Sequence, residues 1–323
     1  MGQTKFQYGV VMDAIGGITP AKDSTLAMML EIQARGGELW VMQQSDLYIE
    51  EGTARARATP MRVFDDNAHW YEAGDQADVN LAELDVILMR KDPPFDMEFI
   101  YTTYILEVAE RGGCLVVNKP AALRDLNEKA STAWFPELAP DTLITRSMAQ
   151  IKAFLAAHEH IVVKPLDGMG GRSIFSLRKG DTNTNVVLET LTDYGQQFAM
   201  AQTFLPEITD GDKRVLLIDG APVEFMLARV PNAEDGRGNL VMGATGDARP
   251  LGEREREIAV AVGKMLRERG VLFAGLDIIG SALTEINVTS PTGIRELDKH
   301  FAINIAGMLL DAIERRLSER ASA

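Results

Sequence analysis

The sequence has 323 residues, of which 46% are hydrophobic, enough to bury a substantial core in about two or three compact units. Acidic residues outnumber basic ones by 47 to 33, and the formal charge of −14 disfavours nucleic-acid phosphates and anionic membranes as partners. The start of the chain lacks the layout of a secretion signal, and no stretch approaches the length of a membrane span, so we expect a cytoplasmic protein.

Strand-like and helical runs alternate in the first third of the chain. We expect strands at 6–12, 38–42, 85–90 and 114–118, and helices at 24–35 and 97–111. Strands separated by helices of this length favour parallel βαβ units, so residues 1–125 are predicted to form a Rossmann-like α/β domain. Gly16 and Gly17 follow the first strand, but their spacing does not complete a dinucleotide-binding motif. The only cysteine, Cys114, lies in an apolar run and is expected to be a buried structural thiol.

The rest of the chain is predicted to form two α+β subdomains, at 126–205 and 206–323. In the first we expect helices at 147–158 and 186–194 and strands at 161–165, 173–177 and 198–204. In the second we expect strands at 214–218 and 222–229 and helices at 252–269 and 306–320. A polar, glycine-containing loop at 231–246 is either a mobile lid over a site or a plain connector.

The run from Lys164 to Gly171, KPLDGMGG, places a lysine at a strand end before three glycines. Glycines allow a backbone to approach a polyphosphate closely, and the lysine adds a point charge. The alternative is a tight turn after an exposed lysine, and the run does not match the Walker pattern.

Glu285 and Asn287 lie two residues apart in a predicted strand, so their side chains share one face. If 280–282 forms a three-residue hairpin loop, Asp277 stands opposite Glu285 and Leu276 stands opposite Ile286. A two-residue loop would move Asp277 to the apolar face. Opposed carboxylates with an amide suit Mg²⁺, whereas the alternative is a surface hairpin with ordinary acidic residues.

Several cations are weaker candidates, because each alone is compatible with a solvated surface position. Arg90 ends a strand of the first domain, where parallel sheets bind ligands, or else begins a loop stiffened by two prolines. The four histidines show no metal-binding spacing. The other candidate cations are Lys129, Lys213, Arg214, Arg229 and Arg237.

At these residues the chain resembles bacterial glutathione synthetase, a member of the ATP-grasp superfamily, and the resemblance runs nearly end to end. The stretches that carry it are LDVILMRKDPPFD at 84–96, VNKP at 117–120, NEK at 127–129, KPLDGMGG at 164–171, DGDKRV at 210–215, RGNL at 237–240, and 276–291, which contains TEINVTSP. One departure lies in the loop, where Thr245 stands in a run that often reads Gly-Gly-Arg-Gly in the family.

The resemblance implies a Rossmann-like pre-ATP-grasp domain followed by two subdomains that grip ATP, and a homotetramer. The implied ATP contacts are Lys129, Lys164, Gly168, Gly170, Gly171, Gln202, Phe204, Leu205, Asp212 and Arg214. The implied Mg²⁺ or Mn²⁺ ligands are Asp277, Glu285 and Asn287, and the implied contacts to the peptide substrate are Arg90, Asn118, Arg229 and Arg295. Arg214 and Arg237 are expected to be catalytic.

The reaction that the resemblance implies joins γ-glutamylcysteine to glycine. ATP would phosphorylate a carboxylate, and the glycine amine would attack the acyl phosphate, without a protein nucleophile. Two alternatives stay open at this point. One is a ligase of the same superfamily with another substrate, such as D-alanine:D-alanine ligase or a protein-glutamylating enzyme, and the other is a catalytically silent ATP-binding module.

Overall fold

The computed structural model describes residues 5–168, 172–231 and 245–322. Four parallel strands form the centre of the first sheet, in the order β2-β1-β7-β8. Each of these strands is mostly buried, as expected for a sheet covered on both faces. The predicted Rossmann-like arrangement is therefore confirmed. Its elements are β1 (Gln7–Val11), η1 (Ile15–Gly17), α1 (Ser24–Ala34), β2 (Glu38–Met42), β7 (Val86–Met89), α2 (Met97–Arg111), β8 (Leu115–Val117) and α3 (Pro120–Asp125).

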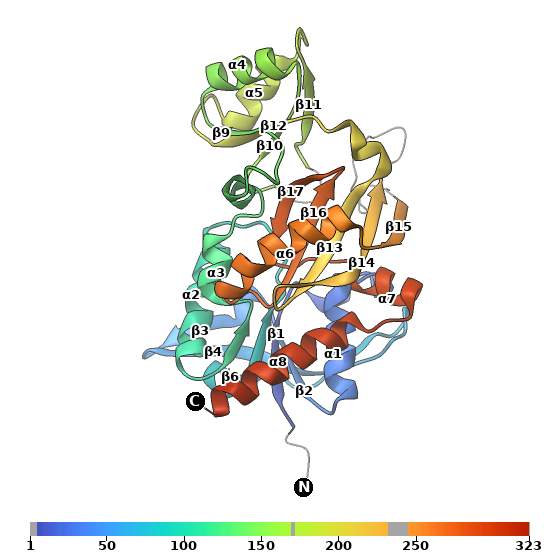
Figure 1. The fold of residues 1–323 in the computed structure, drawn as a ribbon. Coiled ribbons are helices and arrows are strands. Elements are labelled where there is room, and N and C mark those ends of the chain that lie inside the picture. Colours follow the sequence, from blue (N-terminus) through green and yellow to red (C-terminus); the bar gives the residue numbers. More distant parts are fainter. Residues whose placement is uncertain (1–4, 169–171, 232–244, 323) are drawn as a thin grey trace.

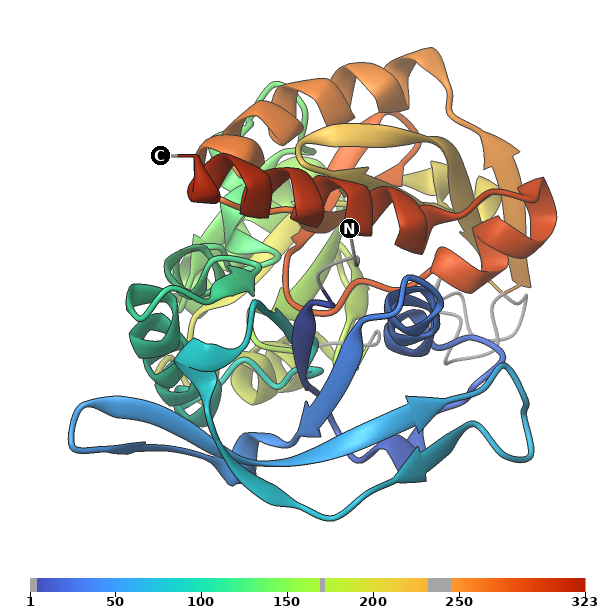
Figure 2. The same ribbon diagram turned by 90° about the horizontal axis from the view of Figure 1, so that it is seen from below.

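An antiparallel extension of this sheet, at 47–80, was not predicted. Its long central strand β4 (Thr53–Val63) pairs with β2 and with three shorter strands, and these strands form the curved lower edge of the molecule in Figure 2. Alanines and arginines alternate along the first half of β4, and alanine has little preference for strands, which explains why the pattern was missed. The remaining elements are η2 (Gln44–Asp46), β3 (Leu47–Glu50), β5 (Tyr71–Ala73), β6 (Ala77–Asn80) and η3 (Leu81–Glu83).

The second unit is a four-stranded antiparallel sheet in the order β11-β10-β12-β9, covered by two helices. It has a hydrophobic core of its own, which includes Ile151, Leu155, Ile161 and Val163. In Figure 1 it stands apart from the other two sheets. Its elements, with the connections at both ends, are η4 (Ala130–Trp134), β9 (Thr142–Thr145), α4 (Met148–His158), β10 (His160–Pro165), β11 (Phe175–Arg178), α5 (Thr184–Thr192), β12 (Ala199–Thr203) and η5 (Pro206–Asp210).

The third unit is a five-stranded antiparallel sheet in the order β15-β14-β13-β16-β17. It shares two hydrophobic clusters with the first domain, and its last helix packs on α1. The first and third units are therefore joined by continuous cores, whereas the second has a separate one. The unit boundaries expected at 125 and 205 stay predictions. The elements are β13 (Asp212–Ile218), β14 (Ala221–Val230), β15 (Thr245–Pro250), α6 (Glu253–Glu268), β16 (Phe273–Ile279), β17 (Ala282–Asn287), α7 (Ile294–Phe301) and α8 (Ile305–Ala321).

Within these described ranges, every helix is too short or too polar to cross a lipid bilayer.

Candidate active site

The hairpin of β16 and β17 brings the predicted metal-binding carboxylates together. Asp277 pairs with Glu285 and Leu276 with Ile286, as predicted. The expected three-residue loop is wrong, because Ile279 pairs with Ala282 and leaves only Gly280 and Ser281 in the turn. The register shifts by one residue between Asp277 and Ile278, and this β-bulge restores the predicted pairing.

Two arginines hold the Asp277 carboxylate from neighbouring strands. Arg214 of β13 donates two hydrogen bonds to it, at 2.5 and 3.0 Å, and Arg229 of β14 lies 2.8 Å from its Oδ2. The Asn287 amide also donates to Oδ2, at 3.3 Å. Burial alone would raise the pKa of Asp277, but the two guanidiniums outweigh it and hold this pKa well below its usual range. Asp277 is therefore ionised at neutral pH.

Two buried lysines from different elements of the second unit converge on Glu285 of the third. Lys129, at the start of η4, and Lys164, near the end of β10, place their Nζ atoms 3.6 and 3.7 Å from Glu285 Oε1. Burial lowers the pKa of Lys164. Burial acts in the same direction on Lys129, but Glu285 and Glu128 reverse it, so that the pKa of Lys129 is raised. Both distances exceed a hydrogen bond, which leaves Glu285 oxygens available to another ligand.

Asp212 is a half-buried carboxyl, one oxygen of which is buried without a partner among the described residues. Its Oδ2 lies 2.5 Å from Nη2 of Arg229, whereas Oδ1 is buried and has no hydrogen-bond partner among the described residues. Burial, together with Asp277 and Glu285, raises the pKa of Asp212 to about 7 in spite of Arg229. An orphaned buried oxygen beside two more carboxylates fits a site that receives a cation.

The charges of this cluster nearly cancel. The carboxylates of Glu128, Asp212, Asp277 and Glu285 face the cations of Lys129, Lys164, Arg214 and Arg229, four against four. A triphosphate would therefore add negative charge that these eight side chains do not balance. The oxygen donors of Asp277, Glu285 and Asn287 suit a hard divalent cation, which would supply the missing charge.

The predicted nucleotide contacts follow the strands of the second unit. Gln202 is buried on β12 and donates to Thr142 Oγ1 at 3.0 Å, and Phe204 stacks on His160 with 3.8 Å between ring centroids. Leu205 comes next along the chain. The Gly168 carbonyl accepts a hydrogen bond from Lys129 Nζ at 2.6 Å, which places this glycine beside the lysine cluster. Gly170, Gly171 and Arg237, and most of the expected lid at 231–246, lie outside the described residues.

The predicted peptide contacts lie where the first domain meets the third unit. Arg90 is buried and donates to Thr25 Oγ1 and to the Pro291 carbonyl, at 3.1 and 3.0 Å. Its Nη1 is buried without a hydrogen-bond partner in the described part of the chain. Arg295 forms an ion pair with Asp65.

Both polar atoms of the Asn118 side-chain amide are engaged in hydrogen bonds within the structure. Its Nδ2 donates to the carbonyls of Phe273 and Val288, both at 2.7 Å, and its Oδ1 accepts from the N–H groups of Leu272 and Phe273. These four bonds tie β8 to the third unit. Any contact of Asn118 with substrate would have to replace one of them, so its predicted role stays a prediction.

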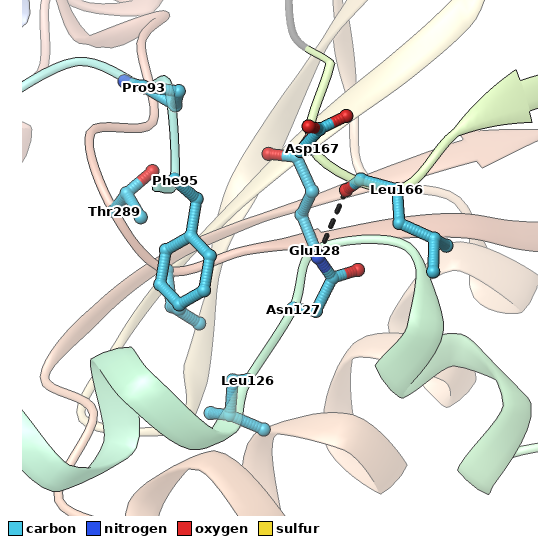
Figure 3. A pocket seen from close by; sticks show the side chains of 9 residues that line it. Pro93, Phe95, Leu126, Asn127, Glu128, Leu166, Asp167 and Thr289 are labelled. Atoms are coloured by element: carbon cyan, nitrogen blue, oxygen red, sulfur yellow. Dashed lines mark hydrogen bonds between the residues drawn. The ribbon is translucent and has the colours of Figure 1, made fainter. Parts of the chain in front are cut away.

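A shallow, solvent-open pocket lies next to the cluster, between the three units (Figure 3). None of its lining residues was a predicted site residue, although all of them except Leu126 lie inside the quoted stretches. Burial and the nearby Glu285 raise the pKa of Glu128 in spite of Lys129. The lining residues are Pro93, Phe95, Leu126, Asn127, Glu128, Leu166, Asp167, Val288 and Thr289, and the Asn127 amide bonds to the Leu166 carbonyl at 2.9 Å.

Comparison with known proteins identifies the family. Residues 6–124 match the model of the prokaryotic glutathione synthetase N-terminal domain, and residues 128–302 match that of the ATP-grasp domain of the same enzymes. The glutathione synthetase of Pseudomonas putida is 58% identical over 97% of this chain and 99% of its own length, and that of Escherichia coli K12 is 55% identical over the same shares. The chain belongs to the prokaryotic glutathione synthetase family.

Solved structures support the same fold at much lower sequence identity. D-cycloserine synthetase DcsG has a TM-score of 0.68 at 15% identity, covering 96% of this chain and 99% of its own. D-alanyl-alanine synthetase A from Vibrio cholerae has a TM-score of 0.62 at 11% identity, covering 98% and 100%. These likenesses show the ATP-grasp fold. Membership of the family makes the chain an ATP-dependent ligase, as predicted, of a kind that generally uses a divalent metal.

Proposed function

We propose that this chain joins γ-glutamylcysteine to glycine through an acyl phosphate. The terminal phosphoryl group of ATP passes to the dipeptide carboxylate that will meet glycine, and ADP leaves. The glycine amine then attacks the acyl carbon and inorganic phosphate departs. The observation that carries this proposal is the cluster in which Asp277 and Glu285 face each other beneath Lys129 and Lys164, because phosphoryl transfer requires mainly alignment and charge neutralisation.

The metal-binding role is assigned to Asp277, Glu285 and Asn287. Bound Mg²⁺, or Mn²⁺, would neutralise the triphosphate and polarise the transferred phosphoryl group. Arg214 and Arg229 hold the Asp277 carboxylate in place and keep it ionised, so that it is ready as a ligand across the neutral pH range. The unpaired Oδ1 of the neighbouring Asp212 and the near neutrality of the cluster support this assignment.

ATP is assigned to the space between the second and third units. Lys129 and Lys164 would contact its phosphates with Gly168, Gly170 and Gly171, and the adenine would lie beside Gln202, Phe204 and Leu205. Asp212 and Arg214 complete the proposed contacts. The buried positions of both lysines support this, since a charge kept from water acts strongly on a phosphate that reaches it.

The dipeptide is assigned to the junction that contains Arg90, Asn118, Arg229 and Arg295. The buried Nη1 of Arg90 supports a bound carboxylate, because such a group would provide the partner that this N–H lacks. Arg214 and Arg237 are proposed to stabilise the charge that develops on the transferred phosphoryl group. No protein nucleophile takes part, in keeping with the buried position of Cys114.

The decisive experiment measures ADP release with γ-glutamylcysteine, glycine and Mg²⁺. We expect ADP release only when γ-glutamylcysteine and glycine are both present. We expect Glu285→Ala to abolish ADP release, whereas Glu257→Ala, on the exposed face of α6, should retain it. Turnover with D-alanine or with glutamate in place of these substrates would point to another ligase of the superfamily. ATP binding without ADP release in every mixture would point to a silent module.

We further propose a cytoplasmic homotetramer, with Mg²⁺ as the physiological metal and the loop at 231–246 as a lid. The family resemblance supports the tetramer. Light scattering coupled to size-exclusion chromatography tests it, and a mass of one or two chains would contradict it. Rates compared at equal free Mg²⁺ and Mn²⁺ test the metal.

A further inference from the structure

The bulge in the β16–β17 hairpin consists of one extra residue, Thr284. On β16, Ala274, Leu276 and Ile278 alternate into the hydrophobic core, and Asp277 lies on the opposite face. On β17 the core residues are Leu283 and Ile286, and Val288 follows just beyond the strand, so the first interval is three residues rather than two. Thr284 fills the additional position.

Without the bulge, the two-residue turn would misplace the metal ligands. Ile279 pairs with Ala282 and Ile278 with Leu283, and continuing that register would set Thr284 opposite Asp277 and Glu285 opposite Leu276. Because neighbouring residues of a strand point to opposite faces, Glu285 would then enter the core. The bulge is what brings Glu285 to the face of Asp277.

Thr284 also bonds to both sides of the site. Its side-chain hydroxyl donates to the Asp277 carbonyl at 3.0 Å, across the bulge, and its own carbonyl accepts from Lys164 Nζ at 3.4 Å. The residue is only 6% exposed. A hydroxyl that bonds across a bulge offsets the local disruption of the ladder. In this position Thr284 links Asp277, a proposed metal ligand, to Lys164, a proposed phosphate contact.

We propose that Thr284 is a positioning residue whose hydroxyl fixes the bulge and thereby the spacing of the Asp277 and Glu285 carboxylates for a divalent cation. The proposal rests on the metal site proposed above. Thr284 itself supplies no ligand to the metal and contacts no substrate in this assignment. It therefore affects metal affinity indirectly, by positioning the Asp277 and Glu285 carboxylates that bind the metal.

The test is Mn²⁺ binding in the presence of ADP, measured by electron paramagnetic resonance without turnover. We expect Thr284→Val, which keeps the shape but lacks the hydroxyl, to weaken Mn²⁺ binding about tenfold, the usual size of an effect on groups that orient metal ligands. Thr284→Ser keeps the hydroxyl and should stay within about twofold of the original protein. Thr102→Val is a matched control, because Thr102 is equally buried and donates to one carbonyl at 2.9 Å, in α2.

A second measurement follows the hairpin itself. Amide hydrogen exchange over 276–287 should accelerate in Thr284→Val and not in Thr284→Ser, while circular dichroism remains unchanged. If Thr284→Val does not fold, Thr284→Ala carries the same expectations. Unchanged Mn²⁺ affinity in a folded variant without the hydroxyl would overturn the proposal.

Glu285→Gln separates this inference from the metal assignment on which it rests. We expect this variant to lose Mn²⁺ binding. If it does so while Thr284→Val and Thr284→Ala bind normally, only the role of Thr284 is wrong. If Glu285→Gln binds Mn²⁺ as the original protein does, the metal assignment fails, and the role of Thr284 fails with it.

Discussion

Arg90 is a buried guanidinium whose Nη1 has no hydrogen-bond partner among residues 5–168, 172–231 and 245–322. Burial lowers the pKa of Arg90, because the charged guanidinium is removed from water. A carboxylate of the dipeptide would complete its hydrogen bonds. We expect Arg90→Lys to raise the KM for γ-glutamylcysteine about tenfold, roughly 1.4 kcal/mol, because lysine keeps the charge and loses the planar donor pair.

Steady-state kinetics with varied dipeptide, at saturating ATP and glycine, measures this effect of Arg90→Lys. The KM for ATP should change little. Arg62→Lys is the control, since Arg62 is an exposed arginine in the strand extension of the first domain. An unchanged KM for the dipeptide in Arg90→Lys would remove Arg90 from the proposed substrate contacts.

Cys114 provides a second test at the scale of one residue. Burial raises the pKa of this thiol to about 12, so the reactive thiolate is almost absent at neutral pH. We expect no reaction with a thiol reagent in the native protein at pH 8, and full reaction in guanidinium chloride, followed by absorbance of the released chromophore. Rapid labelling of the native protein would show that β8 opens locally.

Most parallel strands and long helices were predictable at the scale of elements, because their patterns are local. The helix predicted at 97–111 and the strand at 38–42 have the observed bounds. The bulge was not predicted, although the three-residue interval from Leu283 to Ile286 contains its signal. A strand pattern does not reveal by itself whether an extra residue lies in the turn or inside the strand, because both give the same pairing of Asp277 with Glu285.

The candidate site shows the same limit. Sequence reasoning selected Asp277, Glu285 and both lysines from motifs, and the structure brings these four side chains together. It did not find Glu128 as a member of the cluster or the pocket beside it. Both features depend on how the three units pack together, and a local sequence pattern does not determine that packing.

A buried ion pair stabilises the turn of the β16–β17 hairpin. Lys213 Nζ lies 2.6 Å from Glu255 Oε1, and it also donates to the Gly280 carbonyl at 3.1 Å. Both side chains are largely buried, so removing one partner leaves the other uncompensated. We expect Glu255→Ala to lower the free energy of unfolding by about 3–5 kcal/mol, measured by urea denaturation.

The double variant Lys213→Met, Glu255→Leu is the informative comparison for this pair. Replacing a buried ion pair by apolar side chains of similar size is often neutral, so the double variant should be more stable than either single substitution. If Glu255→Ala costs less than about 1 kcal/mol, the pair is effectively solvated and does not secure the turn.

At the scale of the whole molecule, α8 joins the first domain to the third unit. Arg35 of α1 donates to Asp311 and to the Gly307 carbonyl of α8, at 2.7 and 3.0 Å. On the other side, Arg315 and Arg316 of α8 donate to Asp219, in the turn between β13 and β14, at 3.0 and 2.7 Å. Apolar residues of α8 lie in the same hydrophobic cluster as those of α1 and β1. The helix therefore couples the relative position of two units that share the proposed substrate site.

The contact at Asp219 makes this coupling dependent on pH. Burial alone would raise the pKa of Asp219, but the hydrogen bonds and charges of Arg316 and Arg315, with Arg267 nearby, lower it. A carboxyl whose pKa is lower in the folded state stabilises the fold above its unfolded pKa, and this contribution is lost as the pH falls through the folded value. We expect Asp219→Asn to be about 1–2 kcal/mol less stable than the original protein at pH 7.

The difference between the two proteins should shrink below about pH 4, where the aspartate of the unfolded chain becomes protonated. Urea denaturation at pH 7, 5 and 3.5 measures it, with Asp311→Asn as the control, because Asp311 forms an exposed ion pair on the same helix. A difference that persists unchanged at low pH would mean that the Asp219 carboxylate acts through its shape and not through its charge. The attachment of the helix at this turn would then not depend on the charge of Asp219.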